Sequence, residues 1–146
     1  MEKTKTLVIV SGYFNPVHKG HIDYLKRSKE LGDELFAIVN NDYQRALKGS
    51  VEFMKEDERC EIVSNLKPVD WAIVAIDKDR EVAKTIKLIY ETHKDEYHKF
   101  IFANGGDQLT YSISEKSMCD KLGIEMVFGM GDKIQSSSWL LSLIHI

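Results

Sequence analysis

The chain of 146 residues is long enough to bury a sizeable core, and 43% hydrophobic and 29% charged residues are typical of one globular domain. Its formal net charge of −3 argues against nucleic acid or an anionic membrane as the main partner, because both favour basic surfaces. Cys60 and Cys119 form no Cys-x-x-Cys pair. No apolar run approaches the ~20 residues of a membrane span, and the start MEKTK is too short and polar for a signal peptide. We therefore expect one cytoplasmic domain over 1–146.

Short apolar runs alternate along the chain with segments of helical periodicity. The apolar runs do not alternate between apolar and polar residues, which is typical of strands covered on both faces. The helical segments gather their apolar side chains on one side, and the second begins with acidic residues in its first turn. In chain order we predict strand 6–10, helix 21–31, strand 34–40, helix 55–66, strand 71–76, helix 79–93, strand 99–103, helix 112–123, strand 124–129 and a last helix over 136–144.

Strand followed by helix, five times over, predicts right-handed βαβ units and a parallel sheet. The expected fold is therefore a single Rossmann-like α/β domain with a five-stranded parallel sheet and helices on both faces. In such sheets ligands bind outside the carboxyl ends of the strands, where the strand order reverses. If the first strand is central, the loop that follows it, SGYFNPVHKGH, lies at that point.

Two histidines in this loop, His18 and His21, allow three interpretations. They could bind a metal, although no Cys, Asp or Glu nearby completes a ligand set. One of them could simply cap the following helix, while the other is incidental. The third interpretation is anion chemistry, since a helix N-terminus offers unpaired N–H groups to a phosphate, and Gly12 and Gly20 let the backbone approach it closely. No Walker A and no G-x-G-x-x-G sequence occurs, so ordinary NTPase and dinucleotide sites lose their main support.

The stretch GYFNPVHKGH resembles the H-x-G-H signature of the nucleotidyltransferase superfamily, which includes glycerol-3-phosphate cytidylyltransferase, heptose-1-phosphate adenylyltransferase and nicotinate-mononucleotide adenylyltransferase. Further blocks resemble heptose-phosphate adenylyltransferases in the same order along the chain. These blocks are VNNDYQRALKG (39–49), Glu58 with Arg59, LKPVDWAIVAIDKD (66–79), NGGD (104–107) and QSSS (135–138).

The resemblance implies transfer of a nucleotidyl group from an NTP to a phosphorylated acceptor, with release of pyrophosphate and no covalent enzyme intermediate. It implies catalytic roles for His18, His21 and Lys48, and Mg²⁺ held mainly by the nucleotide phosphates rather than by a protein metal site. Arg59 could instead form an ion pair on a helix surface. The nucleotide-binding residues that the resemblance implies are Gly12, Tyr13, Phe14, Asn15, Gly20, Arg59, Gly105, Gly106, Asp107, Lys133, Ser136, Ser137 and Ser138.

Departures from the family patterns narrow the choice of acceptor. Lys133 stands in the region where glycerol-phosphate cytidylyltransferases carry an arginine, and Trp139 and Leu140 follow the serine block where nicotinate-mononucleotide enzymes carry one. A phosphorylated sugar or polyol is therefore the preferred acceptor, with ATP ahead of CTP and a homodimer as the family's common state. The alternatives are a nicotinate-mononucleotide-type adenylyltransferase and a non-catalytic nucleotide-binding module on the same fold.

The last residues, 141–146, read LSLIHI. This tail resembles the translation of a transposon-end sequencing adapter, and we therefore hypothesise that it is not native. A source gene that encodes these residues would contradict that hypothesis.

Overall fold

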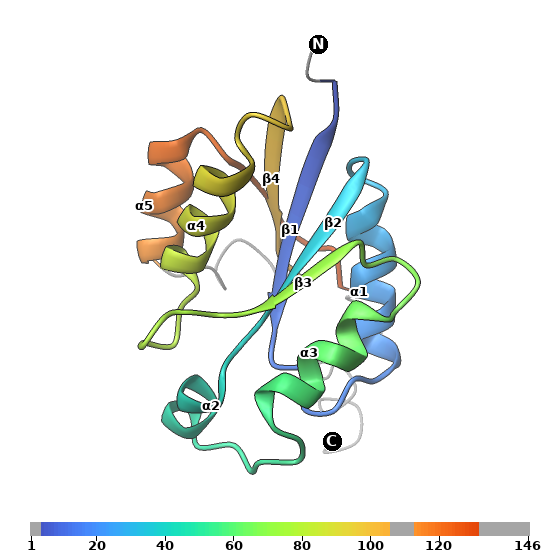
Figure 1. Ribbon diagram of the computed structural model, residues 1–146, viewed down its shortest axis with the longest axis vertical. Helices are drawn as coiled ribbons and strands as arrows, with labels where there is room; N and C mark the ends of the chain where they lie inside the picture. Colours follow the sequence, from blue (N-terminus) through green and yellow to red (C-terminus); the bar gives the residue numbers. More distant parts are fainter. Residues whose placement is uncertain (1–3, 106–112, 132–146) are drawn as a thin grey trace, which may run out of the picture.

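The first strand lies at the centre of the sheet. The structure, a computed structural model, describes residues 4–105 and 113–131, which contain a five-stranded sheet in the order β3-β2-β1-β4-β5. Every neighbouring pair is parallel, which confirms the predicted Rossmann-like α/β fold (Figure 1). The elements are β1 (Thr6–Gly12), α1 (Lys19–Lys29), β2 (Glu34–Val39), α2 (Asp42–Lys48), α3 (Glu56–Ser64), β3 (Trp71–Val74), α4 (Ala83–His93), β4 (Lys99–Ala103), α5 (Ile113–Leu122) and β5 (Glu125–Val127).

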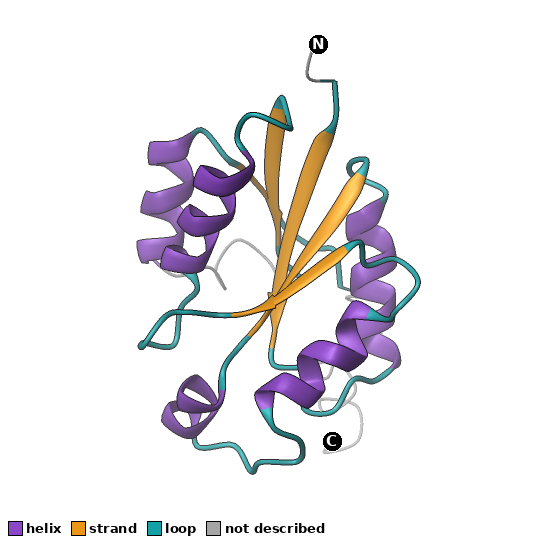
Figure 2. Cartoon of the chain, in the orientation of Figure 1, coloured by secondary structure: helices purple, strands orange, loops and turns teal. Residues whose placement is uncertain are grey.

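Two separate cores explain why the apolar runs do not alternate. Successive side chains of a strand point to opposite faces, so β1 contributes Ile9 to one core and Val8 to the other. The first core includes Ile86 of α4, and the second includes Leu25 of α1 and Val63 of α3. Figure 2 shows α4 and α5 on one side of the sheet and α1 and α3 on the other. Both faces of the central strands are therefore dry.

One helix, α2, was not predicted from the hydrophobic pattern. It is only seven residues long, and Gln44 is its one buried residue, so it has no apolar stripe. Its boundaries do have a sequence signal. Asn41 and Gln44 form a reciprocal capping box, and Gly49 ends the helix with a φ of 83°.

The other boundaries differ by a few residues from the prediction. The third strand ends at Val74, because the chain then turns into a loop of residues 75–82 that the prediction had divided between strand and helix. The fifth strand covers only Glu125–Val127. The expected helix over 136–144 lies outside the described residues.

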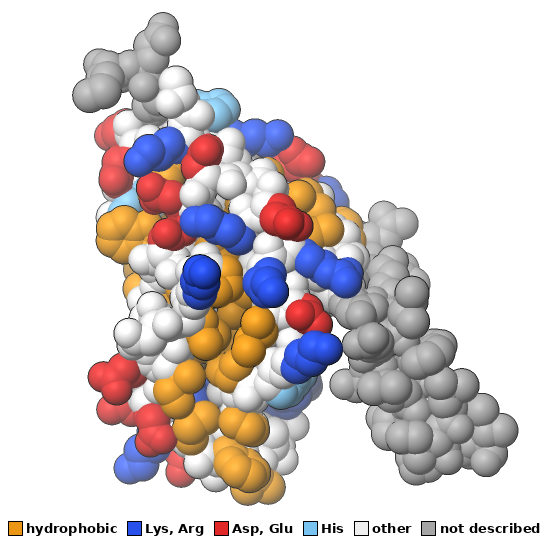
Figure 3. Space-filling model, turned by 90° about the vertical axis from the view of Figure 1, so that its right-hand side faces the viewer, with side chains coloured by type: hydrophobic (Ala, Val, Ile, Leu, Met, Phe, Trp, Pro, Cys, Tyr) orange, Lys and Arg blue, Asp and Glu red, His pale blue; other side chains and the backbone are white. Residues whose placement is uncertain are grey.

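The face formed by α1 and α3 carries acidic and basic side chains intermixed around hydrophobic ones, which gather towards its lower end (Figure 3). Figure 1 places the connection between α2 and α3 at that end of the molecule. In this connection Val51 is 78% exposed and Phe53 is 72% exposed. No helix in the described part of the chain is long and apolar enough to cross a membrane.

Candidate active site

The loop after β1 packs tightly on itself before α1 begins. Phe14 has a φ of 51° and turns its ring, which is fully buried, back under Gly12. A Cβ atom at Gly12 would lie 2.9 Å from that ring, so any side chain there would have to displace the buried ring. The peptide bond between Asn15 and Pro16 is cis. Gly12 and Phe14 therefore shape the loop from within, and any contact they make with a nucleotide would come from their backbone.

His18 and His21 together cap α1. The Nδ1 atom of His18 accepts a hydrogen bond from the Gly20 N–H at 3.0 Å, and the Nδ1 atom of His21 accepts one from the His18 N–H at 3.2 Å. To make the first bond, the His18 ring folds over Gly20, where a Cβ atom would lie 2.9 Å from it. The glycine between the histidines is required by this cap. The expected histidine cap is thus present, but neither histidine is incidental to it, because both side chains take part.

The cap also fixes which nitrogen of each ring faces outward. Since both Nδ1 atoms accept backbone N–H groups, the proton of each neutral ring is on Nε2, which remains free to donate. Burial, followed by the charges of His18 and Lys48, lowers the pKa of His21 to about 4. The ring centroids are 3.9 Å apart. Around neutral pH His21 is an uncharged donor beside the other imidazole, an arrangement suited to an anion at the helix N-terminus.

Lys48, predicted to be catalytic, is the last residue of α2. Its Nζ atom lies 4.4 Å from the centroid of the Tyr13 ring, close enough for a cation–π contact. Its charge also contributes to the low pKa of His21, so the ammonium group and the imidazole are near one another. The structure thus brings all three predicted catalytic side chains to one edge of the sheet.

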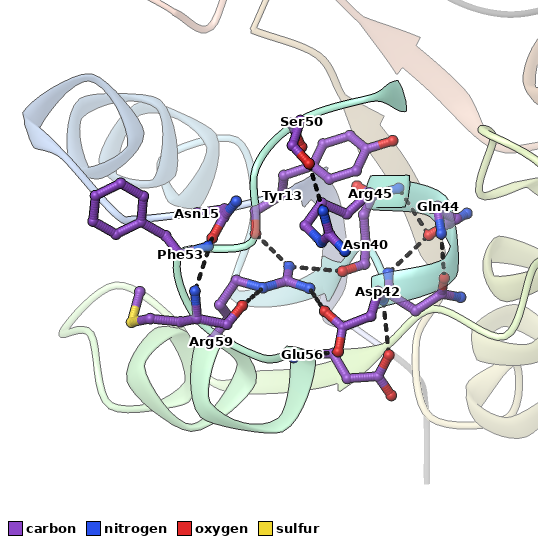
Figure 4. A network of polar contacts seen from close by, with 12 residues as sticks. Tyr13, Asn15, Asn40, Asp42, Gln44, Arg45, Ser50, Phe53, Glu56 and Arg59 are labelled. Atoms are coloured by element: carbon purple, nitrogen blue, oxygen red, sulfur yellow. Dashed lines mark hydrogen bonds and ion pairs between the residues drawn. The ribbon is translucent and has the colours of Figure 1, made fainter. Parts of the chain in front are cut away.

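Arg59 is buried at the centre of a polar network rather than exposed on a helix (Figure 4). Its guanidinium group donates to the carbonyls of Tyr13 at 2.6 Å, Asn40 at 2.8 Å and Met54 at 3.0 Å, and it pairs with the Asp42 carboxylate at 2.8 Å. The surface ion pair considered from the sequence is therefore wrong. Through these four bonds the buried Arg59 joins the loop after β1 to the start of α2, and its contact with a nucleotide stays a prediction.

Asn15 connects the same loop to the segment between α2 and α3. Its side-chain amide donates to the Val51 carbonyl at 2.7 Å, and its side-chain oxygen accepts from the N–H groups of Phe53 and Met54 at 3.0 and 3.1 Å. These bonds use both ends of the amide. Asn15, predicted to bind nucleotide, thus holds the exposed α2–α3 connection against the histidine loop.

A cleft of about 310 Å³ opens at the carboxyl ends of β1, β2 and β4, where the sequence predicted a ligand. Its lining combines Gly12 and Tyr13, which were predicted to bind nucleotide, with residues that had no predicted role, including Arg80. The Nδ2 atom of Asn104 is buried and has no hydrogen-bond partner among the described residues. The lining is formed by Ser11, Gly12, Tyr13, Asn40, Arg80, Val82, Asn104 and Glu115.

The predicted NGGD turn is described only at its start. Gly105 follows β4, lies against the Tyr24 ring and accepts a hydrogen bond from the Gly131 N–H at 3.0 Å. The remaining predicted nucleotide-binding residues lie outside the described residues, and their roles stay predictions. They are Gly106, Asp107, Lys133, Ser136, Ser137 and Ser138.

No set of metal ligands is formed in 4–105 and 113–131, where no three His, Cys, Asp or Glu side chains come together as a metal site. The structure instead adds polar residues that the sequence did not single out. Asn41 and Gln44 were detectable as an N-x-x-Q capping signal. Asp77 and Thr85 bond to each other eight positions apart, which no short capping signature covers, and Arg80 has its place in the cleft, which no local pattern indicates.

Comparison with known proteins agrees with this geometry. The family model described as cytidylyltransferase-like matches residues 9–134. FAD synthase from Thermoplasma acidophilum is 36% identical over 117 residues, which cover 80% of this chain and 75% of that protein. The bifunctional protein HldE from Actinobacillus succinogenes is 32% identical over 73% of this chain, but only 24% of HldE is matched.

Solved structures are similar as well. The lipopolysaccharide core biosynthesis protein from Thermoplasma volcanium GSS1 superposes with a TM-score of 0.65 at 33% identity, covering 86% of this chain and 94% of that one. A putative nicotinate-nucleotide adenylyltransferase from Vibrio parahaemolyticus has a TM-score of 0.57 at 11% identity and shares the fold. The chain therefore belongs to the cytidylyltransferase-like family and is an enzyme of the nucleotidyltransferase type.

Proposed function

We propose that this enzyme transfers a nucleotidyl group from an NTP to the phosphate of a small acceptor and releases pyrophosphate. The observation that carries the proposal is the histidine cap of α1, which leaves two Nε2 donors at a helix N-terminus, at the same edge of the sheet as the cleft. An oxygen of the acceptor phosphate would attack the α-phosphorus of the NTP. The bond from that phosphorus to the oxygen bridging to the β-phosphate would break, and pyrophosphate would leave with that oxygen.

The chain's side chains would act by position and charge. His18 and His21 would donate to the α-phosphate oxygens, whose charge changes in the transition state, and a preorganised donor of this kind contributes about 2.7–4 kcal/mol. Lys48, held over Tyr13, would neutralise charge between acceptor phosphate and α-phosphate. The predicted roles of Ser136 to Ser138 on the outer phosphates belong to the same proposal.

Mg²⁺ would be held mainly by the phosphates of the nucleotide. Among the residues that line the described cleft, Glu115 supplies the one carboxylate, and its Oε2 atom accepts from the Val82 N–H at 3.0 Å. Such a lining fits Mg²⁺, which keeps several water and phosphate ligands and needs few from the protein. When bound, the ion would neutralise phosphate charge.

For the acceptor we propose FMN first and a sugar phosphate second, with ATP as the donor. FAD is an adenylyl group joined to FMN, and the relatives named FAD synthase support this order. One structural feature also favours it. Val51 and Phe53, strongly exposed, are tied by Asn15 to the histidine loop and provide an apolar surface suited to a flat ring. The HldE relatives support the sugar phosphate.

The test is pyrophosphate release with ATP or CTP against FMN, a heptose phosphate, glycerol 3-phosphate and nicotinate mononucleotide. ATP-dependent release with FMN, and formation of FAD, is the expected result. NTP binding without release across the whole panel would favour the non-catalytic module instead. Thermal-shift titration with ATP and CTP checks the base separately, and stabilisation by CTP alone would overturn the preference for ATP. The homodimer stays a prediction, which light scattering would test.

A further inference from the structure

The loop between β3 and α4 carries a cation into the cleft. Arg80 is exposed on this loop of residues 75–82 and lines the cleft together with Tyr13. The two side chains interact. Burial raises the pKa of the Tyr13 hydroxyl, and the charge of Arg80 and its hydrogen bond to Tyr13 oppose that rise. Neither the histidine signature nor the other predicted site residues include this arginine.

Two buried amides hold this loop from the side of α2. The Nδ2 atom of Asn41 donates to the carbonyls of Ala75 and Asp77, both at 2.9 Å. The Nε2 atom of Gln44 donates to the carbonyls of Asp79 at 2.8 Å and Glu81 at 2.7 Å. Asn41 is 6% exposed and Gln44 is fully buried, so these bonds are shielded from water. They hold the backbone on both sides of Arg80.

A second buried pair fixes the far end of the loop. The Asp77 carboxylate accepts from the N–H groups of Lys84 and Thr85 at 2.9 and 3.1 Å, and the Thr85 hydroxyl also donates to it. The same hydroxyl accepts from the Ile76 N–H at 2.9 Å. Asp77 thereby caps α4, which has no side-chain cap at Val82. Arg80 is presented by a loop whose ends and middle are all anchored.

Tyr13 lies between two cations, Lys48 and Arg80. Together with the two histidines they form a row of hydrogen-bond donors. His18 stacks beside His21, His21 is near Lys48, Lys48 lies on the Tyr13 ring, and Arg80 reaches the Tyr13 hydroxyl. The proposed reaction brings two anions together at the α-phosphate. In the proposed reaction His18 and His21 bind the α-phosphate of the nucleotide. Arg80, at the other end of the row, is then available for the phosphate of the acceptor.

We propose that Arg80 is a specificity-determining residue that binds the phosphate of the acceptor. This inference rests on the proposed function. The anchored loop fixes the backbone from which the Arg80 side chain enters the cleft, and the planar set of donors of its guanidinium suits two oxygens of a phosphate. Lys48 lies between this phosphate and the α-phosphate, and Arg80 holds the acceptor end.

The test is steady-state kinetics of the full chain with the acceptor that the wild type uses, varying acceptor and NTP separately. Arg80→Ala should raise the KM for the acceptor about 10- to 100-fold, the range for one lost charge-assisted hydrogen bond, and change the KM for NTP less than about twofold. Arg80→Lys keeps the positive charge but not the two parallel N–H donors, so its KM for the acceptor should lie between those of the wild type and Arg80→Ala. Lys78→Ala is the matched control, because Lys78 is on the same loop but lies over the Tyr43 ring, outside the cleft.

Two outcomes would overturn the inference while the proposed function stands. In one, Arg80→Ala leaves the KM for the acceptor unchanged. In the other, it raises the KM for NTP as much as that for the acceptor. A wild-type enzyme that releases no pyrophosphate with any acceptor would refute the proposed function, and the role of Arg80 with it. Urea unfolding of the variant separates these cases from a loss of fold.

Discussion

Replacing Arg59 with methionine tests whether the guanidinium group is the hub of the active-site edge. Methionine fills much of the space and removes every donor. The carbonyls of Tyr13, Asn40 and Met54 would lose their bond to Arg59, and Asp42 would lose its ion pair. The substitution therefore loosens three segments at once, namely the loop after β1, the start of α2 and the segment before α3.

The expected loss of unfolding free energy is about 3–5 kcal/mol, the usual cost of removing one partner from a buried ion pair. The sum of four charge-assisted bonds would be larger, but such contributions are not additive. Asp42 also limits the loss, because its side chain is 30% exposed and still accepts from the Glu56 N–H at 3.2 Å. Since domains of this size have about 5–15 kcal/mol in total, the variant should fold but be marginal.

Urea denaturation measures the effect. With a slope of about 2 kcal/mol per molar, a loss of 4 kcal/mol moves the midpoint down by about 2 M. Arg80→Met is the matched control, since it removes an exposed arginine and should change stability by less than about 0.5 kcal/mol. If Arg59→Met does not fold, Arg59→Lys should show a smaller loss. A loss below about 1 kcal/mol in Arg59→Met, with normal turnover, would refute the proposed role of the network.

Other predictions concern the caps and the histidines. His18→Ala should lower turnover by about 10²–10³ and cost about 1 kcal/mol through the lost cap, and near-normal turnover would contradict its role as a donor. Asp77→Ala should lower the unfolding free energy by about 1–2 kcal/mol because Lys84 and Thr85 lose their acceptor, and an unchanged urea midpoint would argue against that cap. The pKa of His21 is about 4 in the folded protein and 6.5 in the unfolded chain, so the unfolded chain binds the His21 proton more tightly. The titration of His21 should therefore leave the stability unchanged above about pH 6.5 and lower it as the pH falls towards 4. After screening by solvent, the loss of unfolding free energy over this pH range is about 1 kcal/mol. His21→Gln should remove this contribution to the pH dependence of stability. An equal pH dependence in both proteins would contradict the lowered pKa.

The sheet could be predicted because its signal is repeated along the chain. Apolar runs that do not alternate require two covered faces, and β1 indeed contributes to both cores. The position of the site followed from the same argument, since β1 is central and the histidine loop leaves its carboxyl end. These conclusions depended on patterns of several residues and not on single side chains.

The polar network could not be predicted, because its bonds join residues that are distant in the sequence. Arg59 reads as one cation among the acids of α3, yet it is fully buried and bonds to Tyr13, 46 positions earlier. Asn15 reads as part of a signature, yet both ends of its amide bond to the α2–α3 connection. Backbone carbonyls that need a donor leave no trace in the sequence.

The histidine cap implies a compromise in the choice of residue at the start of α1. Serine, asparagine or aspartate would cap the start of the helix at least as well. None of them has a ring that must fold over Gly20, as that of His18 does. Serine would use its single hydroxyl oxygen in the cap, and the second oxygen of aspartate could not donate to an anion. An imidazole has two nitrogens on opposite edges, so it can secure its own helix with one and serve an anion with the other. The first turn of α1 is thus built from the groups that would do the chemistry, and neither task can be changed without the other.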